Sequence, residues 1–82
     1  MKVHINIFPI AGLCNQSKKL DLNLEEGNLG EVLILLEQIL DAKLSKLEEL
    51  IFLHNGRGVD KRKEILFQDG DQLWLLPMIS GG

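Results

Sequence analysis

Few side chains of this 82-residue chain could carry out acid–base, nucleophilic or metal chemistry. Cys14 is the single cysteine, which excludes an internal disulfide and a multi-cysteine metal site and favours a small apolar role over a reactive thiol. His4 and His54 have no third ligand near them in sequence, so we interpret both as surface strand residues and predict no metal site. Asp69 and Asp71 flank a glycine, which is typical of a tight turn rather than of a catalytic carboxylate pair.

The remaining candidate is the Gly81-Gly82 pair at the end of the sequence. With glycine at about 7% of residues, such a pair ends a random chain roughly once in 200. Glycine has no Cβ and adopts nearly any φ and ψ, so this tail can enter a channel too narrow for other residues. The chemistry available there is that of the terminal carboxylate of Gly82. A carboxylate is a poor electrophile, because its negative charge repels nucleophiles, so it has to be activated first.

Composition excludes several classes of protein. The net charge of −3 provides no attraction to nucleic acid or to anionic membranes. A chain of this length forms one domain that is too small for a deep active site of its own, so we do not expect a stand-alone enzyme. Residues 1–14 lack the pattern of a signal peptide, and no apolar run could span a membrane. Together with the lone cysteine, these features predict a cytoplasmic protein.

Two stretches near the start of the chain alternate between apolar and polar residues, the pattern of a half-buried strand. Residues 2–8 show it first and residues 18–24 repeat it. The segment between them contains proline and glycine, which predicts an antiparallel hairpin. The apolar sides are Val3, Ile5 and Ile7 in the first stretch, and Leu20, Leu22 and Leu24 in the second.

The apolar period changes from two to about 3.6 after Gly27, which predicts a helix from residue 29 to about residue 41. Asn28 is the predicted N-cap, with Glu31 as its capping-box partner. Ile34 falls on the opposite side, toward solvent or a partner. The predicted buried face consists of Leu29, Val32, Leu33, Leu36, Ile39 and Leu40.

The following residues return to strand patterns. Residues 42–49 are ambiguous between a short helical turn and a packed loop, whereas residues 50–54 are a predicted strand. Asn55-Gly56 is a strong turn dipeptide, because both residues tolerate positive φ, and a short returning strand is expected around Val59.

The last quarter of the chain completes the predicted sheet. Ile65 and Leu66 are expected to fill the core from a turn, and residues 69–71 form a tight turn. Residues 72–76 are the last predicted strand, which Pro77 ends because it has no N–H for a ladder.

The order of elements predicts an α+β roll: a mixed four- to five-stranded sheet with one main helix packed on one face. We expect the first and last strands to lie side by side and parallel in the middle of the sheet. The predicted domain covers residues 1–77, and residues 78–82 form a flexible Gly-Gly tail.

Several segments resemble one family. Asp-Gly-Asp-Gln-Leu at 69–73 and Leu-Pro-Met-Ile-Ser-Gly-Gly at 76–82 resemble the end of the β-grasp sulfur carriers of the MoaD/ThiS family. Residues 8–13 and 53–56 resemble the first loop and the Asn-containing turn of the molybdopterin synthase small subunit, the branch that this chain resembles most. The resemblance implies a ubiquitin-like β-grasp fold.

The resemblance also implies the chemistry of the tail. The carboxylate of Gly82 would be adenylated and then converted to a thiocarboxylate, which donates sulfur in molybdopterin (molybdenum cofactor) biosynthesis. Gly81, Ser80 and Ile79 would thread into the partner, while Pro77 would aim the tail away from the sheet.

The partners implied are enzymes. One is a ubiquitin-activating-type adenylyltransferase of the MoaB-MoeB/ThiF type, which uses ATP. The other is the large subunit of molybdopterin synthase or another sulfur acceptor enzyme. No stably bound cofactor, nucleic acid or membrane is expected.

The alternation of side chains along the last predicted strand indicates where partners bind. Trp74 and Leu76 should lie on the sheet face away from the helix, beside Phe8 and Phe52, and an exposed patch of this kind usually marks a partner surface. The alternative is that loop residues cover this face.

Other functions remain open on the sequence alone. Within the same class, the chain could carry sulfur for the thiamine thiazole, for cysteine, for a tungsten cofactor or for tRNA. In a different class, it could be a ubiquitin-like modifier or interaction module without sulfur transfer.

Overall fold

The computed structural model describes residues 1–10, 15–41, 50–60 and 63–77. Predictions that concern Cys14, residues 42–49 and the tail at 78–82 lie outside the described residues. The described elements are β1 (Lys2–Ile7), β2 (Lys18–Asn23), α1 (Leu29–Leu40), β3 (Leu50–His54), β4 (Arg57–Gly58) and β5 (Gln72–Pro77).

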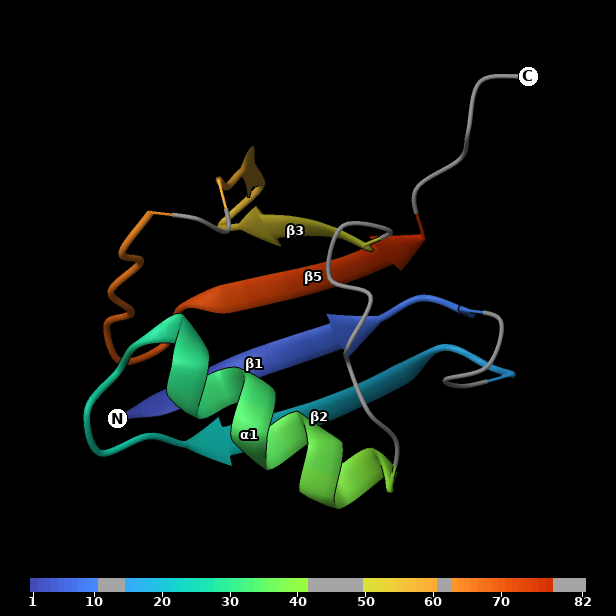
Figure 1. Ribbon diagram of the computed structural model, residues 1–82, viewed down its shortest axis with the longest axis horizontal. Coiled ribbons are helices and arrows are strands. Elements are labelled where there is room, and N and C mark those ends of the chain that lie inside the picture. Colours follow the sequence, from blue (N-terminus) through green and yellow to red (C-terminus); the bar gives the residue numbers. More distant parts are fainter. Residues whose placement is uncertain (11–14, 42–49, 61–62, 78–82) are drawn as a thin grey trace.

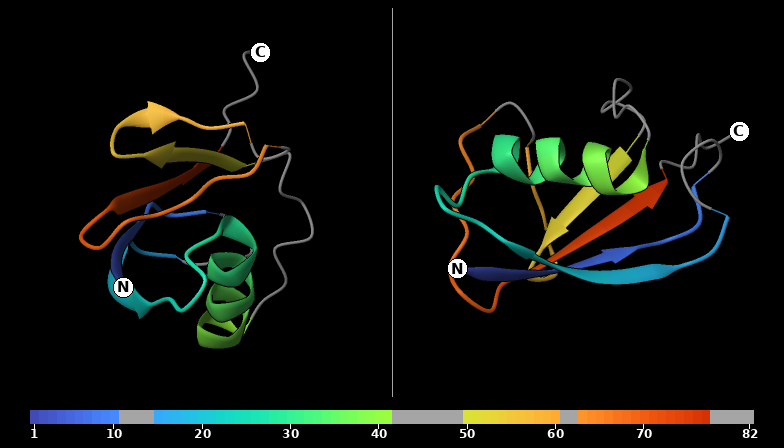
Figure 2. Two further views of the ribbon diagram at one scale, coloured as in Figure 1. Left: turned by 90° about the vertical axis from the view of Figure 1, so that its left-hand side faces the viewer. Right: turned by 90° about the horizontal axis from the view of Figure 1, so that it is seen from below.

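The five strands form one mixed sheet in the order β2-β1-β5-β3-β4. β1 and β5 pair in parallel at its centre, as predicted, and the other three neighbouring pairs are antiparallel. α1 lies across one face of the sheet (Figures 1 and 2), so the predicted α+β roll is confirmed. We call the face under α1 the inner face and the opposite one the outer face.

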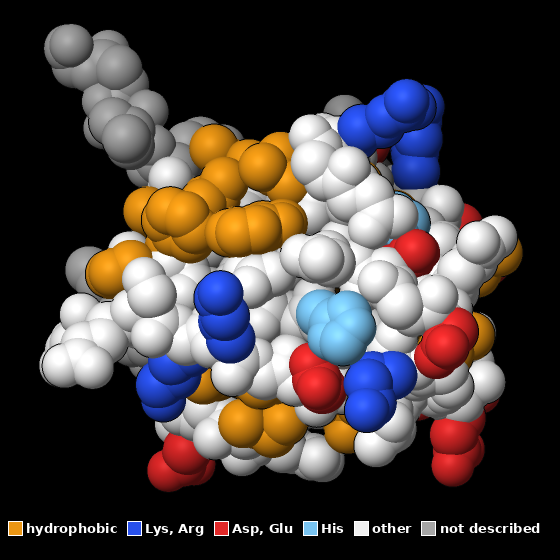
Figure 3. Space-filling model, turned by 180° about the vertical axis from the view of Figure 1, so that it is seen from behind, with side chains coloured by type: hydrophobic (Ala, Val, Ile, Leu, Met, Phe, Trp, Pro, Cys, Tyr) orange, Lys and Arg blue, Asp and Glu red, His pale blue; other side chains and the backbone are white. Residues whose placement is uncertain are grey.

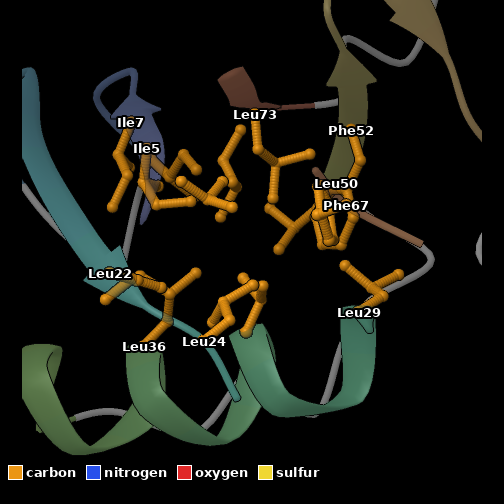
Figure 4. Close-up of a cluster of buried hydrophobic side chains, with 14 residues drawn as sticks. Ile5, Ile7, Leu22, Leu24, Leu29, Leu36, Leu50, Phe52, Phe67 and Leu73 are labelled. Carbon is orange, nitrogen blue, oxygen red and sulfur yellow. The ribbon is translucent and has the colours of Figure 1, made fainter. Parts of the chain in front are cut away.

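The core lies between the inner face and α1. Alternation along β1 turns Val3, Ile5 and Ile7 inward, and each of them is at most 1% exposed. Burying each such side chain contributes roughly 1.5–3 kcal/mol to the free energy of unfolding. Figure 4 shows how the buried side chains of the strands and of α1 point toward one another. The other buried apolar residues are Ile10, Leu22, Leu24, Leu29, Val32, Leu36, Leu50, Phe52, Phe67, Leu73 and Leu75.

The predicted capping box at the start of α1 has one of its two hydrogen bonds. Asn28 is the N-cap, and its side-chain oxygen accepts a hydrogen bond from the Glu31 N–H at 2.8 Å. The Glu31 carboxylate does not return to the Asn28 N–H, as a reciprocal capping box would require. It accepts instead from the backbone N–H groups of Glu25, Glu26 and Gly27 at 2.8, 3.0 and 2.9 Å. These bonds lower the pKa of Glu31, the Glu25 N–H having the largest effect.

The buried face of α1 is narrower than predicted. Ile34 is 59% exposed, as expected for the opposite face. Ile39, however, is 55% exposed, so its assignment to the buried face was wrong. Leu29, Val32 and Leu36 form the centre of the buried stripe. Ile39 lies at the margin of this stripe, where the helix surface already turns toward solvent.

The residue that fills the core from the segment before β5 is Phe67, which is 3% exposed, and not Leu66, which is 62% exposed. The Phe67 N–H donates to the Gly27 carbonyl at 2.7 Å, which holds this segment extended beside the start of α1. Neighbouring side chains of an extended segment point in opposite directions, so Leu66 points outward when Phe67 points inward. Ile65, two residues before Phe67, packs against the core as predicted.

The two predicted turns are confirmed. Asn55 and Gly56 have φ of 52° and 87°, as a two-residue hairpin with both central residues at positive φ requires. The returning strand β4 is Arg57–Gly58, slightly earlier than expected, and Val59 follows it. Gly70 has φ of 89° in the turn before β5.

Replacing Phe67 by alanine should destabilise the protein by about 3 kcal/mol, because the change leaves a cavity in the core. The matched control is Leu66→Ala, the neighbouring exposed position, which should cost about 0.5 kcal/mol or less. Urea unfolding followed by circular dichroism measures both. Equal losses for the two variants would contradict the assignment of Phe67 to the core.

The lowered pKa of Glu31 predicts a pH-dependent contribution to stability. Because the pKa is lower in the folded state, the contribution is present above the ordinary carboxyl pKa and is lost as pH falls through the folded-state pKa. Glu31→Gln should therefore destabilise the protein at pH 7, and the difference from wild type should shrink in acid. Unfolding titrations along a pH series measure this. Glu37→Gln, which removes one negative charge from the last turn of the same helix, is the matched control.

Candidate functional site

The outer face of β5 presents apolar side chains. Leu73 and Leu75 point into the core and are both 0% exposed. Trp74 and Leu76 alternate with them, so they lie on the outer face, where both are half-buried. The sequence predicted this position, on the face away from the helix, for both residues.

The strand register places further apolar residues next to these two. On β3, Leu53 pairs with Trp74 and Ile51 pairs with Leu76, and both β3 residues are half-buried. Phe8, which follows β1, is 41% exposed, and its ring centroid lies 5.7 Å from that of Trp74 at an angle of 59°. A tilted aromatic pair at this distance has favourable geometry. The predicted proximity of Phe8 and Trp74 is therefore confirmed.

We call Phe8, Ile51, Leu53, Trp74 and Leu76 the apolar surface. It lies toward the carboxyl end of β5, and Figure 3 shows a cluster of hydrophobic side chains on this face. An apolar patch with a polar border is typical of a protein–protein interface, and a central tryptophan is among the side chains that contribute most to binding.

Phe52 does not belong to the apolar surface, so its predicted place there was wrong. It pairs with Leu75 and is 1% exposed, which puts it in the core. The cause is the sequence of β3, in which Leu50, Ile51, Phe52 and Leu53 are all apolar and no alternation reveals which face each residue takes. The sequence therefore gave no signal for Ile51 and Leu53, whose place follows from the pairing of β3 with β5.

The other end of the outer face is polar. His4 Nδ1 lies 2.7 Å from a carboxylate oxygen of Asp21 on the neighbouring strand, and both side chains are exposed. The predicted surface position of His4 is thus confirmed. Asn6 is 8% exposed, and its amide donates to the side-chain oxygen of Gln72 at 3.4 Å. Among the described residues there is no group of three potential metal ligands.

The prediction that His54 is a surface residue was wrong, because its side chain is only 20% exposed. Its Nε2 lies 2.7 Å from Oδ2 of Asp71, and its ring lies 4.7 Å from the ring of Phe67. Asp71 also accepts hydrogen bonds from the Gln68 N–H and the Asn55 side-chain amide, at 2.8 and 3.1 Å. These contacts lower the pKa of Asp71, with the Gln68 N–H as the main cause.

The contacts of Asp71 are structural. Asn55 also exchanges two hydrogen bonds with the backbone of Gln72, each 2.8 Å long. The network thereby fixes the turn between β3 and β4 to the start of β5. The interpretation of Asp69 and Asp71 as turn residues fits this arrangement, in which Asp69 accepts from the Lys2 N–H at 2.7 Å.

The predicted chemical residues Gly82, Gly81, Ser80 and Ile79 lie outside the described part of the chain. The structure does describe where that segment begins. β5 ends at Pro77, which pairs with Leu50 at the start of β3. The last described residue therefore lies immediately beside the apolar surface.

No protein-family model matches this sequence, and no curated protein matches it. Within the described residues, α1 is too short to cross a membrane.

Solved structures do match, over the full length of this chain. The HVO 2177 protein of Haloferax volcanii is 23% identical with a TM-score of 0.69, and 87% of that chain is covered. A chain of the complex of subunits 1 and 2 of the molybdopterin-converting factor of Helicobacter pylori is 21% identical with a TM-score of 0.62. SAMP1 of Haloferax volcanii is 19% identical with a TM-score of 0.67, and both of the latter chains are covered completely. At the level of the fold the expected resemblance is confirmed: this chain has a ubiquitin-like β-grasp fold, similar to that of the molybdopterin-converting factor chain and to that of SAMP1.

Proposed function

We propose that this protein is a sulfur carrier whose Gly82 carboxylate is adenylated by a partner enzyme and then converted to a thiocarboxylate. The thiocarboxylate donates its sulfur in cofactor biosynthesis, for which molybdopterin is our first assignment. The observation that carries the proposal is the position of the apolar surface, beside the residue from which the chain continues toward Gly82.

Docking and chemistry are separate tasks in such a carrier. The apolar surface offers a rigid contact area, because Trp74 and Leu76 lie on β5, whose alternate residues are fixed in the core. Five residues follow Pro77, enough to extend roughly 17 Å from the sheet at about 3.3 Å per residue. A partner that binds the apolar surface thus has Gly82 within reach of an active site on its own surface.

The composition of the last residues supports this division. Gly81 and Gly82 have no side chain to clash with the walls of a narrow channel. Once adenylated, the carbonyl carbon of Gly82 becomes a good electrophile. A sulfur nucleophile at the oxidation level of sulfide then forms a bond to that carbon while the bond to AMP breaks, which produces the thiocarboxylate with no change of oxidation state.

The proposed partners are of two kinds. The first is a ubiquitin-activating-type adenylyltransferase, which binds the ATP. The second is the acceptor enzyme, in our assignment the large subunit of a molybdopterin synthase. The similarity in fold to a chain from a complex of two molybdopterin-converting factor subunits supports a partner of this second kind.

The proposal predicts a change at one atom. Incubation of the intact protein with its activating enzyme, ATP and a sulfur donor should replace one oxygen of Gly82 by sulfur, which intact-mass and C-terminal peptide mass spectrometry detects. Omission of ATP and deletion of Gly82 should each abolish the change. Circular dichroism should show that the deletion leaves the fold intact.

Two results would contradict sulfur transfer. One is an unchanged mass when the activating enzyme has demonstrably consumed ATP. The other is attachment of the protein to lysines of other proteins, which would favour a ubiquitin-like modifier. Transfer of the sulfur to a thiazole precursor rather than to a molybdopterin precursor would retain the carrier and change the pathway.

The apolar surface predicts a loss of binding in specific variants. Trp74→Ala should weaken binding to the activating enzyme about 30-fold, since a central tryptophan typically contributes about 2 kcal/mol or more. Isothermal titration calorimetry measures the dissociation constant. The control is Ile34→Ala on the exposed side of α1, because Ile34 is 59% exposed and α1 covers the inner face, opposite to the apolar surface (Figure 2). Unchanged binding of Trp74→Ala, with a native circular dichroism spectrum, would exclude this surface as the docking site.

A further inference from the structure

β2 is the end strand of the described sheet, and one of its edges has no strand beside it among the described residues (Figure 1). Leu24 and Met1 exchange two backbone hydrogen bonds, of 2.7 and 2.9 Å, beside the first pair of the β1–β2 ladder. Doubly bonded pairs alternate along an antiparallel ladder. The N–H and C=O groups of Leu20 and Leu22 therefore face β1, and those of Lys19, Asp21 and Asn23 face the open edge.

The side chains along this edge are charged. Lys19 and Asp21 carry opposite charges, are two residues apart and lie on the outer face, where both are exposed. Leu20 lies between them on the inner face and is half-buried. Charged residues on a short end strand usually prevent pairing with another strand. In this strand the order of the charges permits one particular pairing.

We propose that a second copy of this chain pairs antiparallel with the open edge of β2, around a two-fold axis at Leu20. In that register Lys19 of each copy lies opposite Asp21 of the other. The backbone N–H and C=O groups of both residues face the open edge, so they can form hydrogen bonds to the second copy. The pairing thus satisfies backbone donors and acceptors and forms two Lys–Asp pairs. Each opposite-charge pair directly across two strands is favourable.

The neighbouring registers are unfavourable. An axis at Lys19 would place the two lysines opposite each other, and an axis at Asp21 would place the two aspartates opposite each other. Like charges directly opposite destabilise a strand pair. Of the three registers with an axis at Lys19, Leu20 or Asp21, the one at Leu20 alone places opposite charges directly across from each other.

The same register adds an apolar contact. Leu20 of one copy lies opposite Leu20 of the other, on the inner face, as a pair without ladder hydrogen bonds, in which side chains approach most closely. Asp21 already contacts His4 through one carboxylate oxygen, Oδ1, so Oδ2 is available to Lys19 of the second copy.

The dimer would leave the apolar surface accessible. Four of its five members lie on strands that β1 separates from β2: Trp74 and Leu76 on β5, and Ile51 and Leu53 on β3. A two-fold axis perpendicular to the sheet keeps both outer faces on the same side of one continuous sheet. The β5 strands of the two copies then run in opposite directions. This inference does not depend on sulfur transfer.

Sedimentation equilibrium up to about 1 mM protein tests the proposal, because strand pairs of this size associate weakly. Wild type should form dimers. Asp21→Lys and Lys19→Asp should each weaken association about tenfold, since each replaces two opposite-charge pairs by two like-charge pairs. The double variant Lys19→Asp/Asp21→Lys should restore association, because it exchanges the charges without changing their complementarity. Lys63→Asp, an equal change of charge outside β2, is the control and should have no effect on association.

Amide hydrogen exchange gives an independent readout. Concentrated protein should show added protection at the amides of Lys19 and Asp21, and none at that of Leu20, which already faces β1. A protein that stays monomeric throughout the concentration range would overturn the proposal. So would a dimer that is insensitive to both single variants, or a double variant that fails to recover.

Discussion

Parallel pairing of β1 with β5 determines the arrangement of everything else in this fold. Residues 4–7 lie beside residues 72–75, which brings two distant parts of the chain together at the centre of the sheet. The turn before β5 contributes to this alignment, because the Gly70 N–H donates to the Lys2 carbonyl at 2.7 Å. β2 adds to the outside of β1, β3 adds to the outside of β5, and α1 covers the inner face.

This central pair also separates the two functions of β5. One set of alternate residues fills the core, and the other forms part of the apolar surface. A shift of the register by one residue would exchange the two sets, burying Trp74 and exposing Leu73 and Leu75. The Asp71 network fixes the start of β5 to the turn after β3. It therefore helps to hold the register that keeps Trp74 on the outer face, although it lies at the other end of the strand.

Most of the fold could be predicted from local patterns. β1, β2 and β5 alternate clearly, the helix has an N-cap and a 3.6-residue period, and Asn55-Gly56 and Gly70 mark their turns. Features that depend on a neighbouring segment were harder. The face taken by Phe52 depends on the pairing of β3 with β5, and the choice between Leu66 and Phe67 depends on a hydrogen bond to Gly27. Of the candidate site, Trp74, Leu76 and Phe8 followed from sequence, whereas Ile51 and Leu53 required the sheet.

The central position of β5 has a consequence for the synthesis of the protein. Because β5 follows all the other described elements in the chain, β1 and β3 have no shared neighbour until the ribosome has added Pro77. A growing chain can form α1 and the β1–β2 hairpin, which are local, but the sheet closes only after residues about 70 positions apart have met. Folding of this domain is thus a late event that follows translation of nearly all its residues. Until then, the unpaired strand edges and the apolar inner faces of the two half-sheets are exposed to aggregation.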